Sequence, residues 1–263
     1  MNDTNLDCEE RIDTVNDNIE LIQKKDGLTF GTDALLLAGY IDSGGGRALE
    51  IGGGTGIISL LTLSRGKFDT VDVLEVQEDF AELSERNARR NSLSDKMRVI
   101  CADVREFEAH KQYDAVFTNP PYMKTNTGKA NAVSRKNVAR HEVNGDIEDF
   151  LKAAKRLLKY GGKFYAVYRP DRLTDLIFAM RSVGIEPKRM TVVHADAMHE
   201  PSMVLIEGRL GGGAALKLTR PLIIHSNSRK ESDDMAYIIE NGCFPDDFYI
   251  KNRGRKNGSN RKE

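Results

Sequence analysis

The chain has 263 residues, 40% of them hydrophobic, and its 39 basic and 40 acidic side chains nearly cancel. These values fit a globular protein of one or two domains, and they argue neither for nor against a nucleic-acid partner. No apolar run approaches the length of a membrane span, and the first residues lack the features of a signal peptide. The three cysteines, Cys8, Cys101 and Cys243, have no metal or redox spacing. We therefore expect reduced thiols, no bound metal, no membrane contact and a cytoplasmic location.

Charge is distributed unevenly between the two ends of the chain. Residues 1–20 hold seven acidic side chains and one Arg, whereas residues 251–263 hold six basic side chains and one Glu. Segments with so few apolar residues cannot bury enough surface to fold. We therefore expect an acidic, disordered leader over 1–18, a single domain over 19–250 and a basic, disordered tail over 251–263.

Strand and helix signals alternate along the predicted domain. A turn signal, KKDG, lies between apolar runs at 19–22 and 28–30 and predicts a short hairpin. Thr32 and Asp33 can cap a helix that continues through Tyr40. Further strands are predicted at 48–51, 70–74, 98–102, 113–118, 163–168, 191–194 and 203–207, and further helices at 56–64, 78–90, 146–159 and 170–183. This alternation predicts an α/β fold with a parallel sheet covered by helices on both faces.

The segment after residue 208 is harder to interpret. Three consecutive glycines indicate a turn or linker, and the following ALKLTRPLIIHS predicts an edge strand interrupted at Pro221. A short helix is predicted over 233–240. The sequence alone suggests no role for this part of the chain.

A glycine-rich loop follows the predicted strand at 48–51. Its sequence, GGGTG over 52–56, leads directly into an apolar helix. Such a turn lets a ligand approach the backbone and the N-terminus of the helix. A dinucleotide fingerprint would need its third glycine at Ile57, which disfavours NAD. The spacing of Gly52, Gly54 and Gly56 after the acidic Glu50 instead resembles the loop with which Rossmann-like methyltransferases hold S-adenosylmethionine (SAM); the alternative is a purely structural turn.

Two more carboxylates end the next two predicted strands. Glu75 ends the strand at 70–74, where a carboxylate can accept hydrogen bonds from both ribose hydroxyls. Asp103, followed by Val104, ends the strand at 98–102, where it could accept a hydrogen bond from an adenine amino group. The alternative for Asp103 is an N-cap with Glu106 as its capping-box partner. Both interpretations can hold together.

The fourth strand of the series ends in Asn119-Pro120-Pro121-Tyr122, and two adjacent prolines cannot continue a strand. The pattern (D/N/S)PP(Y/F) at this place resembles the signature of methyltransferases that act on planar nitrogens. By that resemblance the Asn119 oxygen and the Pro120 carbonyl each accept one N–H of the target amine, and Tyr122 stacks on its ring. Stacking contributes about 1–3 kcal/mol per base in such sites. The alternative is a structural turn.

Further motifs resemble one family, the bacterial tRNA1(Val) (adenine-37-N6)-methyltransferases. They are FGTDALLLA at 30–38, NPPYMK at 119–124, ARHE at 139–142, GGKFYAVYRPDRL at 161–173 and RPLIIH at 220–225. The resemblance covers about residues 19–225. It implies a Rossmann-like fold with a mostly parallel seven-stranded sheet, SAM as the cofactor, and methylation of N6 of an adenine in tRNA, namely adenine 37 of valine tRNA. Gly53 departs from the family, which usually has Cys, Ser or Thr there, and this departure is expected to affect cofactor affinity.

The family resemblance also suggests contacts beyond these motifs. It places Thr32 and Asp33 along the methionine end of the cofactor, although both could simply cap a helix. No acidic residue lies between Ala115 and His141, a stretch that predicts an RNA-contacting loop. Its basic residues are Lys124, Lys129, Arg135, Lys136 and Arg140. Arg140, with His141 and Glu142, could instead begin a solvated helix. We expect tRNA as the partner and a monomer or weak homodimer.

Other functions stay open at this point. The chain could methylate guanine N2 in another RNA, or a protein glutamine amide. It could also be an inactive module that senses SAM and binds RNA, although such a module has no chemical reason to keep the NPPY amide. An NAD-dependent oxidoreductase is disfavoured by Ile57 in the glycine loop.

Overall fold

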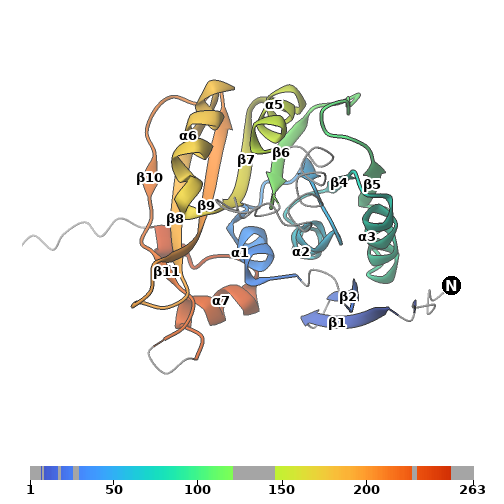
Figure 1. Cartoon of the computed structure of the whole chain (residues 1–263), viewed down its shortest axis with the longest axis horizontal. Coiled ribbons are helices and arrows are strands. Elements are labelled where there is room, and N and C mark those ends of the chain that lie inside the picture. The colour runs from blue at the N-terminus through green and yellow to red at the C-terminus, as the bar shows by residue number, and fades with distance from the viewer. Residues whose placement is uncertain are drawn as a thin grey trace, which may run out of the picture.

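The computed structural model describes residues 7, 9–16, 19–25, 30–120, 146–226 and 230–249. These residues form one large sheet flanked by helices, with a separate hairpin at one side (Figure 1). The strands of the sheet are β3 (Arg47–Ile51), β4 (Thr70–Glu75), β5 (Met97–Cys101), β6 (Tyr113–Thr118), β7 (Leu158–Tyr168), β8 (Ile185–His194), β9 (Pro201–Leu210), β10 (Lys217–Leu218) and β11 (Leu222–Ile223). Their order is β10-β8-β9-β7-β6-β3-β4-β5, and β11 also pairs with β8.

The sheet is mostly parallel, as predicted. Among the described strand pairs of this sheet, only those of β9 with its neighbours β7 and β8 are antiparallel. Within the described residues this sheet contains nine strands rather than seven, because β10 and β11 add two short parallel pieces along the edge of β8. Pro221 lies between these two pieces, and its missing N–H explains why the predicted edge strand is interrupted there.

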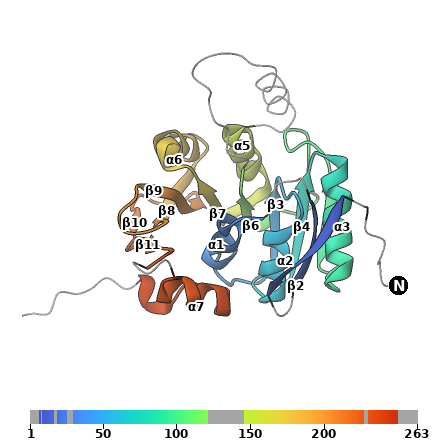
Figure 2. The same cartoon turned by 60° about the horizontal axis from the view of Figure 1, so that its bottom comes forward.

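Helices cover both faces of the sheet. They are α1 (Thr32–Tyr40), α2 (Ile57–Ser64), α3 (Glu78–Arg90), α5 (Ile147–Leu157), α6 (Leu173–Ser182) and α7 (Asp233–Asn241), with short 3-10 turns at Pro170–Arg172 and Asp246–Tyr249. Figure 2 shows α5 and α6 on one side of the sheet and α1 and α2 on the other.

Two helices differ in extent from the prediction. The helical stretch predicted at 170–183 is a 3-10 turn followed by α6. The helix predicted over 146–159 ends slightly earlier, at Leu157, because β7 begins at Leu158 and includes Gly161 and Gly162.

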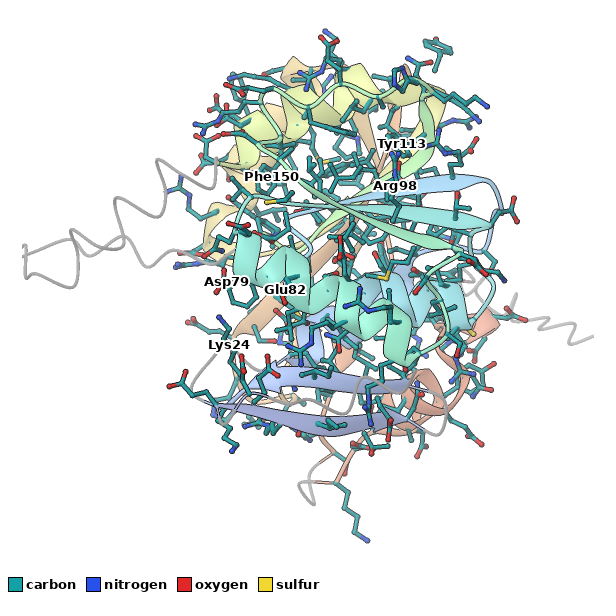
Figure 3. All side chains as sticks on the ribbon, turned by 90° about the vertical axis from the view of Figure 1, so that its right-hand side faces the viewer. Lys24, Asp79, Glu82, Arg98, Tyr113 and Phe150 are labelled. Atoms are coloured by element: carbon teal, nitrogen blue, oxygen red, sulfur yellow. The ribbon has the colours of Figure 1, made fainter. Side chains whose placement is uncertain are left out.

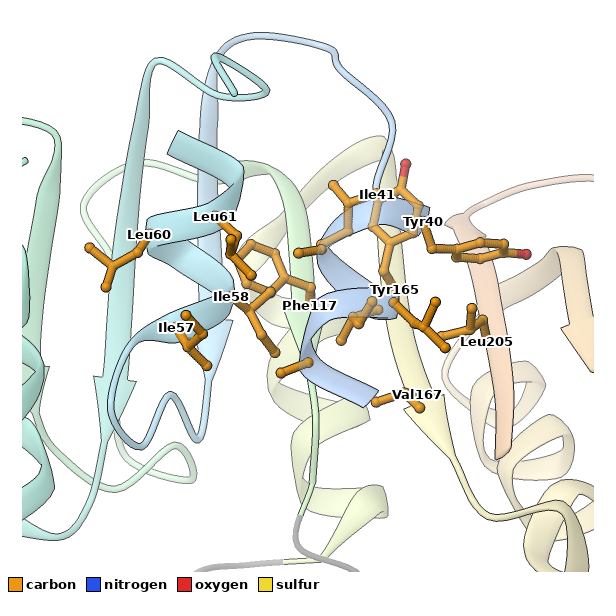
Figure 4. Packing of buried hydrophobic residues seen from close by; sticks show 14 of the residues in the cluster. Tyr40, Ile41, Ile57, Ile58, Leu60, Leu61, Phe117, Tyr165, Val167 and Leu205 are labelled. Carbon is orange, nitrogen blue, oxygen red and sulfur yellow. The ribbon is translucent and has the colours of Figure 1, made fainter. Parts of the chain in front are cut away.

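Two apolar cores lie on the two faces of the sheet. Beneath α1 and α2, Ile58 and Leu61 approach Phe117 of β6, while Tyr40 lies beside Tyr165 of β7 (Figure 4). Burial of one large apolar side chain contributes about 1.5–3 kcal/mol. The second core packs α5 and α6 against the other face of the same strands. Packing on both faces fixes the central strands, and therefore the loops that leave their ends.

The N-terminal hairpin differs from the expectation. It is formed by β1 (Glu10–Asn16) and β2 (Ile19–Lys24), so residues 10–16 are a strand and not part of a disordered leader. The acidic residues that suggested disorder have partners: Arg86 of α3 binds both Glu10 oxygens, at 2.7 and 2.8 Å, and Asp13 accepts hydrogen bonds from Arg11. The hairpin therefore pairs residues 10–16 with residues 19–24, whereas the sequence predicted its two strands at 19–22 and 28–30.

Two asparagines fasten the hairpin to α3. The Asn87 amide exchanges hydrogen bonds with the N–H and C=O of Ile22, at 2.7 and 3.1 Å, and Asn91 does the same with Glu20, at 3.0 and 2.7 Å. Residues four apart share one helix face, so the two amides continue the hydrogen bonding of β2 on the side away from β1. Figure 3 shows the hairpin against α3, with Lys24 beside Asp79.

A buried carboxyl group caps α2. The N-cap residue Gly56 has no side chain to offer. The buried N–H of Ser59, in the first turn of the helix, donates instead to Glu50 Oε2 of β3 at 3.1 Å, and the Ser59 hydroxyl donates to the same oxygen. Glu50 is 1% exposed. Desolvation raises the pKa of Glu50 to about 8, even though the Ser59 hydrogen bonds act in the opposite direction. At neutral pH the group is therefore mostly protonated in the folded chain.

We expect this buried carboxyl to make stability fall as the pH rises. Because the folded pKa of about 8 lies above the ordinary value of 4.5, the contribution of Glu50 is complete below about pH 4.5 and is lost as the pH rises through about 8. Each unit of pKa shift corresponds to about 1.4 kcal/mol. Glu50→Gln keeps the acceptor for Ser59 and cannot ionise, so it should flatten the decline measured by urea unfolding between about pH 5 and 8.5.

The control for this test is Glu82→Gln, at an exposed position of α3. It should follow the wild-type pH dependence. If Glu50→Gln declines as steeply as the wild type, the buried carboxyl is not the group responsible.

Candidate active site

The residues expected to form a site leave four neighbouring strands at the same edge of the sheet. Strands β6, β3, β4 and β5 are parallel and adjacent in that order. Their carboxyl ends lead to Asn119, the glycine loop, Glu75 and Asp103 respectively. In open α/β sheets, ligands bind in the crevice at the carboxyl ends of the strands. The structure thus brings the separate sequence motifs to one edge.

The glycine loop has the backbone conformation that its sequence predicts. Gly52, Gly54 and Gly56 have φ values of 70°, 53° and 79°, in the left-handed region that favours glycine. A Cβ at Gly54 would meet no heavy atom within 4 Å, so open space borders the backbone there. This is the approach to the main chain that a bound ligand requires.

At position 53 a glycine is favoured for a different reason, namely the lack of space for a side chain. A Cβ at position 53 would lie 2.2 Å from Cγ1 of Val73 on β4 and 3.5 Å from the Glu50 carboxyl carbon. A Cys, Ser or Thr side chain would therefore need the β-branched Val73 to move. The departure from the family at this position is explained by close packing between the loop and β4.

Glu75 contacts the glycine loop directly. Its Oε2 accepts a hydrogen bond from the Gly54 N–H and its Oε1 accepts one from the Gln77 N–H, both at 2.9 Å. The residue is only 5% exposed. Each carboxylate oxygen has a second lone pair, so Glu75 can hold the loop and still accept hydrogen bonds from a ligand. Glu50, by contrast, lies beneath the loop, and its effect on a ligand would be indirect.

Asp103 lies in a turn and not at the start of a helix. Its Oδ1 accepts hydrogen bonds from the Arg105 N–H at 2.8 Å and from Arg105 Nε at 2.9 Å. The Arg105 hydrogen bond is the main reason that the pKa of Asp103 is lowered, so the group is charged at neutral pH. Residues 104–106 form a turn, so the helix that a capping box would start is absent from this described segment. Val104 is buried, and its carbonyl accepts from Arg156 of α5 at 3.0 Å.

Asn119 makes a contact that the sequence did not predict. Its Nδ2 donates to Oδ2 of Asp33, in the first turn of α1, at 2.9 Å. Its Oδ1 is buried and has no hydrogen-bond partner in the described part of the chain. A buried carbonyl oxygen without a donor costs free energy, and this one lies at the end of β6 next to the glycine loop. Thr32, beside Asp33, is exposed.

The remaining predicted site residues cannot be placed. Tyr122, Lys124, Lys129, Arg135, Lys136 and Arg140 lie outside the described residues, as do His141 and Glu142. Within the residues that are described, no group of three or more His, Cys, Asp and Glu side chains could hold a metal ion. The same residues contain no helix with both the length and the hydrophobicity needed to cross a membrane.

Two residues that support the site, Asn87 and Arg156, were not predicted from the sequence. Asn87, besides holding β2, donates from Nδ2 to the Thr55 carbonyl in the glycine loop at 3.0 Å. Arg156 Nη2 also donates to the Phe107 carbonyl at 2.8 Å, so it secures the backbone after Asp103. An Asn within an amphipathic helix is a weak helix former, and such a residue can signal a side-chain hydrogen bond to backbone elsewhere. Nothing in the local sequence identified its partner.

The described residues suit SAM. The loop leaves room at Gly54, and Glu75 and Asp103 supply acceptors beside it for hydroxyl and amino groups. An acceptor also suits the cationic groups of such a cofactor, because charge-assisted hydrogen bonds are stronger than neutral ones.

Comparison with known proteins identifies the family of the chain. Residues 22–177 match the family model described as the methyltransferase small domain. A protein of Dyadobacter fermentans named tRNA1(Val) (adenine(37)-N6)-methyltransferase is 31% identical over 167 residues, which are 63% of this chain and 69% of that protein. A Bacteroides fragilis protein of the same name is 30% identical over 186 residues, covering 69% and 77% of the two chains.

Solved structures show the same fold. A crystal structure described as a predicted O-methyltransferase of Agrobacterium tumefaciens superposes with a TM-score of 0.65 at 22% identity, covering 81% of this chain and 98% of the other. The family model spans more than half of the chain, and the tRNA1(Val) enzymes share about 30% of the aligned residues. The chain therefore belongs to the methyltransferase small domain family and, within it, to the family of the tRNA1(Val) (adenine(37)-N6)-methyltransferases.

Proposed function

We propose that the chain transfers a methyl group from SAM to the exocyclic N6 of an adenine in tRNA, with adenine 37 of valine tRNA as the target. Its family makes it a SAM-dependent methyltransferase, and the name of its relatives supports the tRNA adenine. The single observation that carries the chemistry is the Asn119 amide. Its nitrogen has a partner, Asp33, while its buried oxygen lacks a donor.

A donor is what an exocyclic amine supplies. The lone pair of an sp² amino group is delocalised into the ring, so the amine is a poor nucleophile until its geometry is fixed. In the proposed complex, Asn119 Oδ1 accepts one N–H and the Pro120 carbonyl accepts the other, which turns the nitrogen lone pair toward the methyl group. The cofactor supplies an electrophilic methyl group. No strong base is needed, because the methylated amine is acidic and loses its proton afterwards; positioning and electrostatics carry the catalysis.

The cofactor side of the proposed site uses groups already in place. Glu75 would accept from the ribose hydroxyls while it holds Gly54, and Asp103 would accept from the adenine amino group. Gly52, Gly54 and Gly56 would let the cofactor lie against the backbone. Val104 follows Asp103 in a segment fixed by Arg156. Thr32 and Asp33 lie at the start of α1, at the Asn119 side of this edge.

The RNA side of the proposal rests on sequence and family. Bases of an anticodon loop are unpaired, so turning the target adenine into a pocket costs less than it would in a duplex. Tyr122 would stack on that base, and the basic residues between Ala115 and His141 would contact phosphates. The C-terminal tail from residue 251 adds a second basic cluster.

The function is tested by mass spectrometry of tRNA nucleosides from cells that lack the gene. We expect N6-methyladenosine to disappear from valine tRNA and to return with the wild-type gene but not with Asn119→Ala, which removes the acceptor. Tyr122→Phe should restore methylation far better than Tyr122→Ala if stacking matters. Loss of methylated guanosine instead would move the target to guanine, and no change in any tRNA nucleoside would leave the proposal without support.

The cofactor site yields a binding prediction. Glu75→Ala removes a charged acceptor and also releases the Gly54 N–H, so calorimetry should show SAM and its demethylated product bound at least tenfold more weakly. Charge-assisted hydrogen bonds contribute about 1.5–3 kcal/mol. The matched control is Glu78→Ala, at an exposed position three residues along the chain. Unchanged SAM affinity in the Glu75 variant would remove this residue from the site.

The basic stretch predicts how the affinity for tRNA depends on the salt concentration. Neutralising Lys129, Arg135 and Lys136 together should flatten the dependence of log tRNA affinity on log salt by roughly 0.7 per lost phosphate contact. Deleting 251–263 should flatten it less and leave turnover at saturating tRNA unchanged. An identical slope in the triple variant would place the RNA on another surface.

A further inference from the structure

The Asn119 side chain is held in one of two orientations. A carboxamide has nearly the same shape after its oxygen and nitrogen are exchanged, so only its hydrogen-bond partners decide which atom points where. The partner here is Asp33, whose ionised carboxylate can accept hydrogen bonds but cannot donate them. The Asn119 nitrogen must therefore face Asp33, at 2.9 Å, and the oxygen must face the other way.

Asp33 is itself fixed in place. Its Oδ1 accepts from the Ala34 N–H at 2.9 Å, which leaves Oδ2 for Asn119. A Cβ at Gly31 would lie 2.5 Å from that Oδ1, so only glycine leaves the carboxylate this room without a shift of its side chain. The helix that carries it is anchored by the buried Leu36 and Leu37.

The far end of α1 is secured as well. The buried Lys67 ammonium donates to three carbonyls at the C-terminal end of the helix, those of Ala38 at 2.7 Å, Gly39 at 3.1 Å and Ile41 at 2.6 Å. These bonds use all three of its N–H donors and satisfy carbonyls that the helix itself leaves free. Asp33 thus belongs to a helix held at both ends, and Asn119 to the end of a buried strand.

We propose that Asp33 is a positioning residue that sets the orientation of the Asn119 amide, so that Oδ1 and not Nδ2 faces the target amine. This inference rests on the proposed function. The reversed amide would turn its oxygen toward the carboxylate and its N–H groups toward the substrate N–H groups, and both contacts would be repulsive. With Asp33 in place, only a substrate group that donates a hydrogen bond, such as an amine, meets a partner.

The role of Asp33 is distinct from a contact with the cofactor. A residue whose only task is to bind SAM changes SAM affinity when it is replaced. A residue that orients Asn119 changes the turnover number at saturating SAM and tRNA while SAM affinity stays nearly constant. We expect Asp33→Ala to lower kcat about tenfold or more, the scale of one charge-assisted hydrogen bond, with the Kd for SAM changed by less than about threefold.

An exchange of the two side chains makes the sharper test. Asn119→Asp places two carboxylates against each other, and kcat should fall about a hundredfold or more. In the double variant Asp33→Asn/Asn119→Asp the net charge of the pair is that of the wild type. Asn at position 33 then donates to Asp at position 119, whose second oxygen still accepts from the amine. We expect the double variant to regain at least about tenfold in kcat over Asn119→Asp.

Thermal unfolding of the same full-length variants distinguishes a changed orientation of the Asn119 amide from a loss of the folded structure. Each variant must remain folded at the assay temperature, and the exchange should also recover Tm relative to Asn119→Asp if the two side chains pair. Wild-type kcat in Asp33→Ala, or a double variant as inactive as Asn119→Asp, would overturn the role of Asp33 while the wild-type enzyme remained active. A wild-type chain that methylates no tRNA would overturn the proposed function itself, and the unfolding data would then still decide whether Asp33 and Asn119 pair.

Discussion

The loop at 52–56 has four glycines and one Thr, so it depends on other elements to fix its backbone, and the rest of the site depends on how that backbone is fixed. Three side chains from other elements fix it. Glu75 of β4 binds the Gly54 N–H, Asn87 of α3 binds the Thr55 carbonyl, and Glu50 of β3 caps the helix that follows the loop. Because these groups come from the strands and helix that also shape the edge of the sheet, the loop and its surroundings form one hydrogen-bonded unit.

This arrangement links the N-terminal hairpin to the site. The amide that holds Thr55 is the one that binds Ile22 of β2. Gln23, in the same strand, accepts from the Phe30 N–H at 2.8 Å just before α1 begins. The hairpin is therefore linked to both sides of the candidate site, to the glycine loop through Asn87 of α3 and to the segment before Asp33 through Gln23. An extension of this kind can stabilise a site without contributing a residue to it.

The sequence predicted the parts of the structure that have local signals. The boundaries of α3 and β6 follow from amphipathic spacing and from an apolar run before two prolines, and the glycine loop follows from its spacing after a strand. The strand at 10–16 was missed because its acidic residues looked solvated, whereas Glu10 pairs with Arg86, 76 residues further along the chain. The contact between Asp33 and Asn119 spans 86 residues and has no local pattern. Glu50 illustrates a third limit of prediction from sequence. Its position near the glycine loop was predictable, but its burial beneath the loop was not.

The charges at this edge favour donors as ligands. Asp33, Glu75 and Asp103 present carboxyl oxygens, and Asn119 adds an amide oxygen without a partner. Arg105 lowers the pKa of Asp103, whereas burial keeps Glu50 mostly protonated below pH 8 and so limits its repulsion with the nearby Glu75. Ribose hydroxyls, an adenine amino group, a sulfonium and a target amine are all donors or cations. The proposed reaction needs no group that acts as a strong base, so an edge that offers hydrogen-bond acceptors and restrains their mutual repulsion suits both a cationic methyl donor and the proposed target amine.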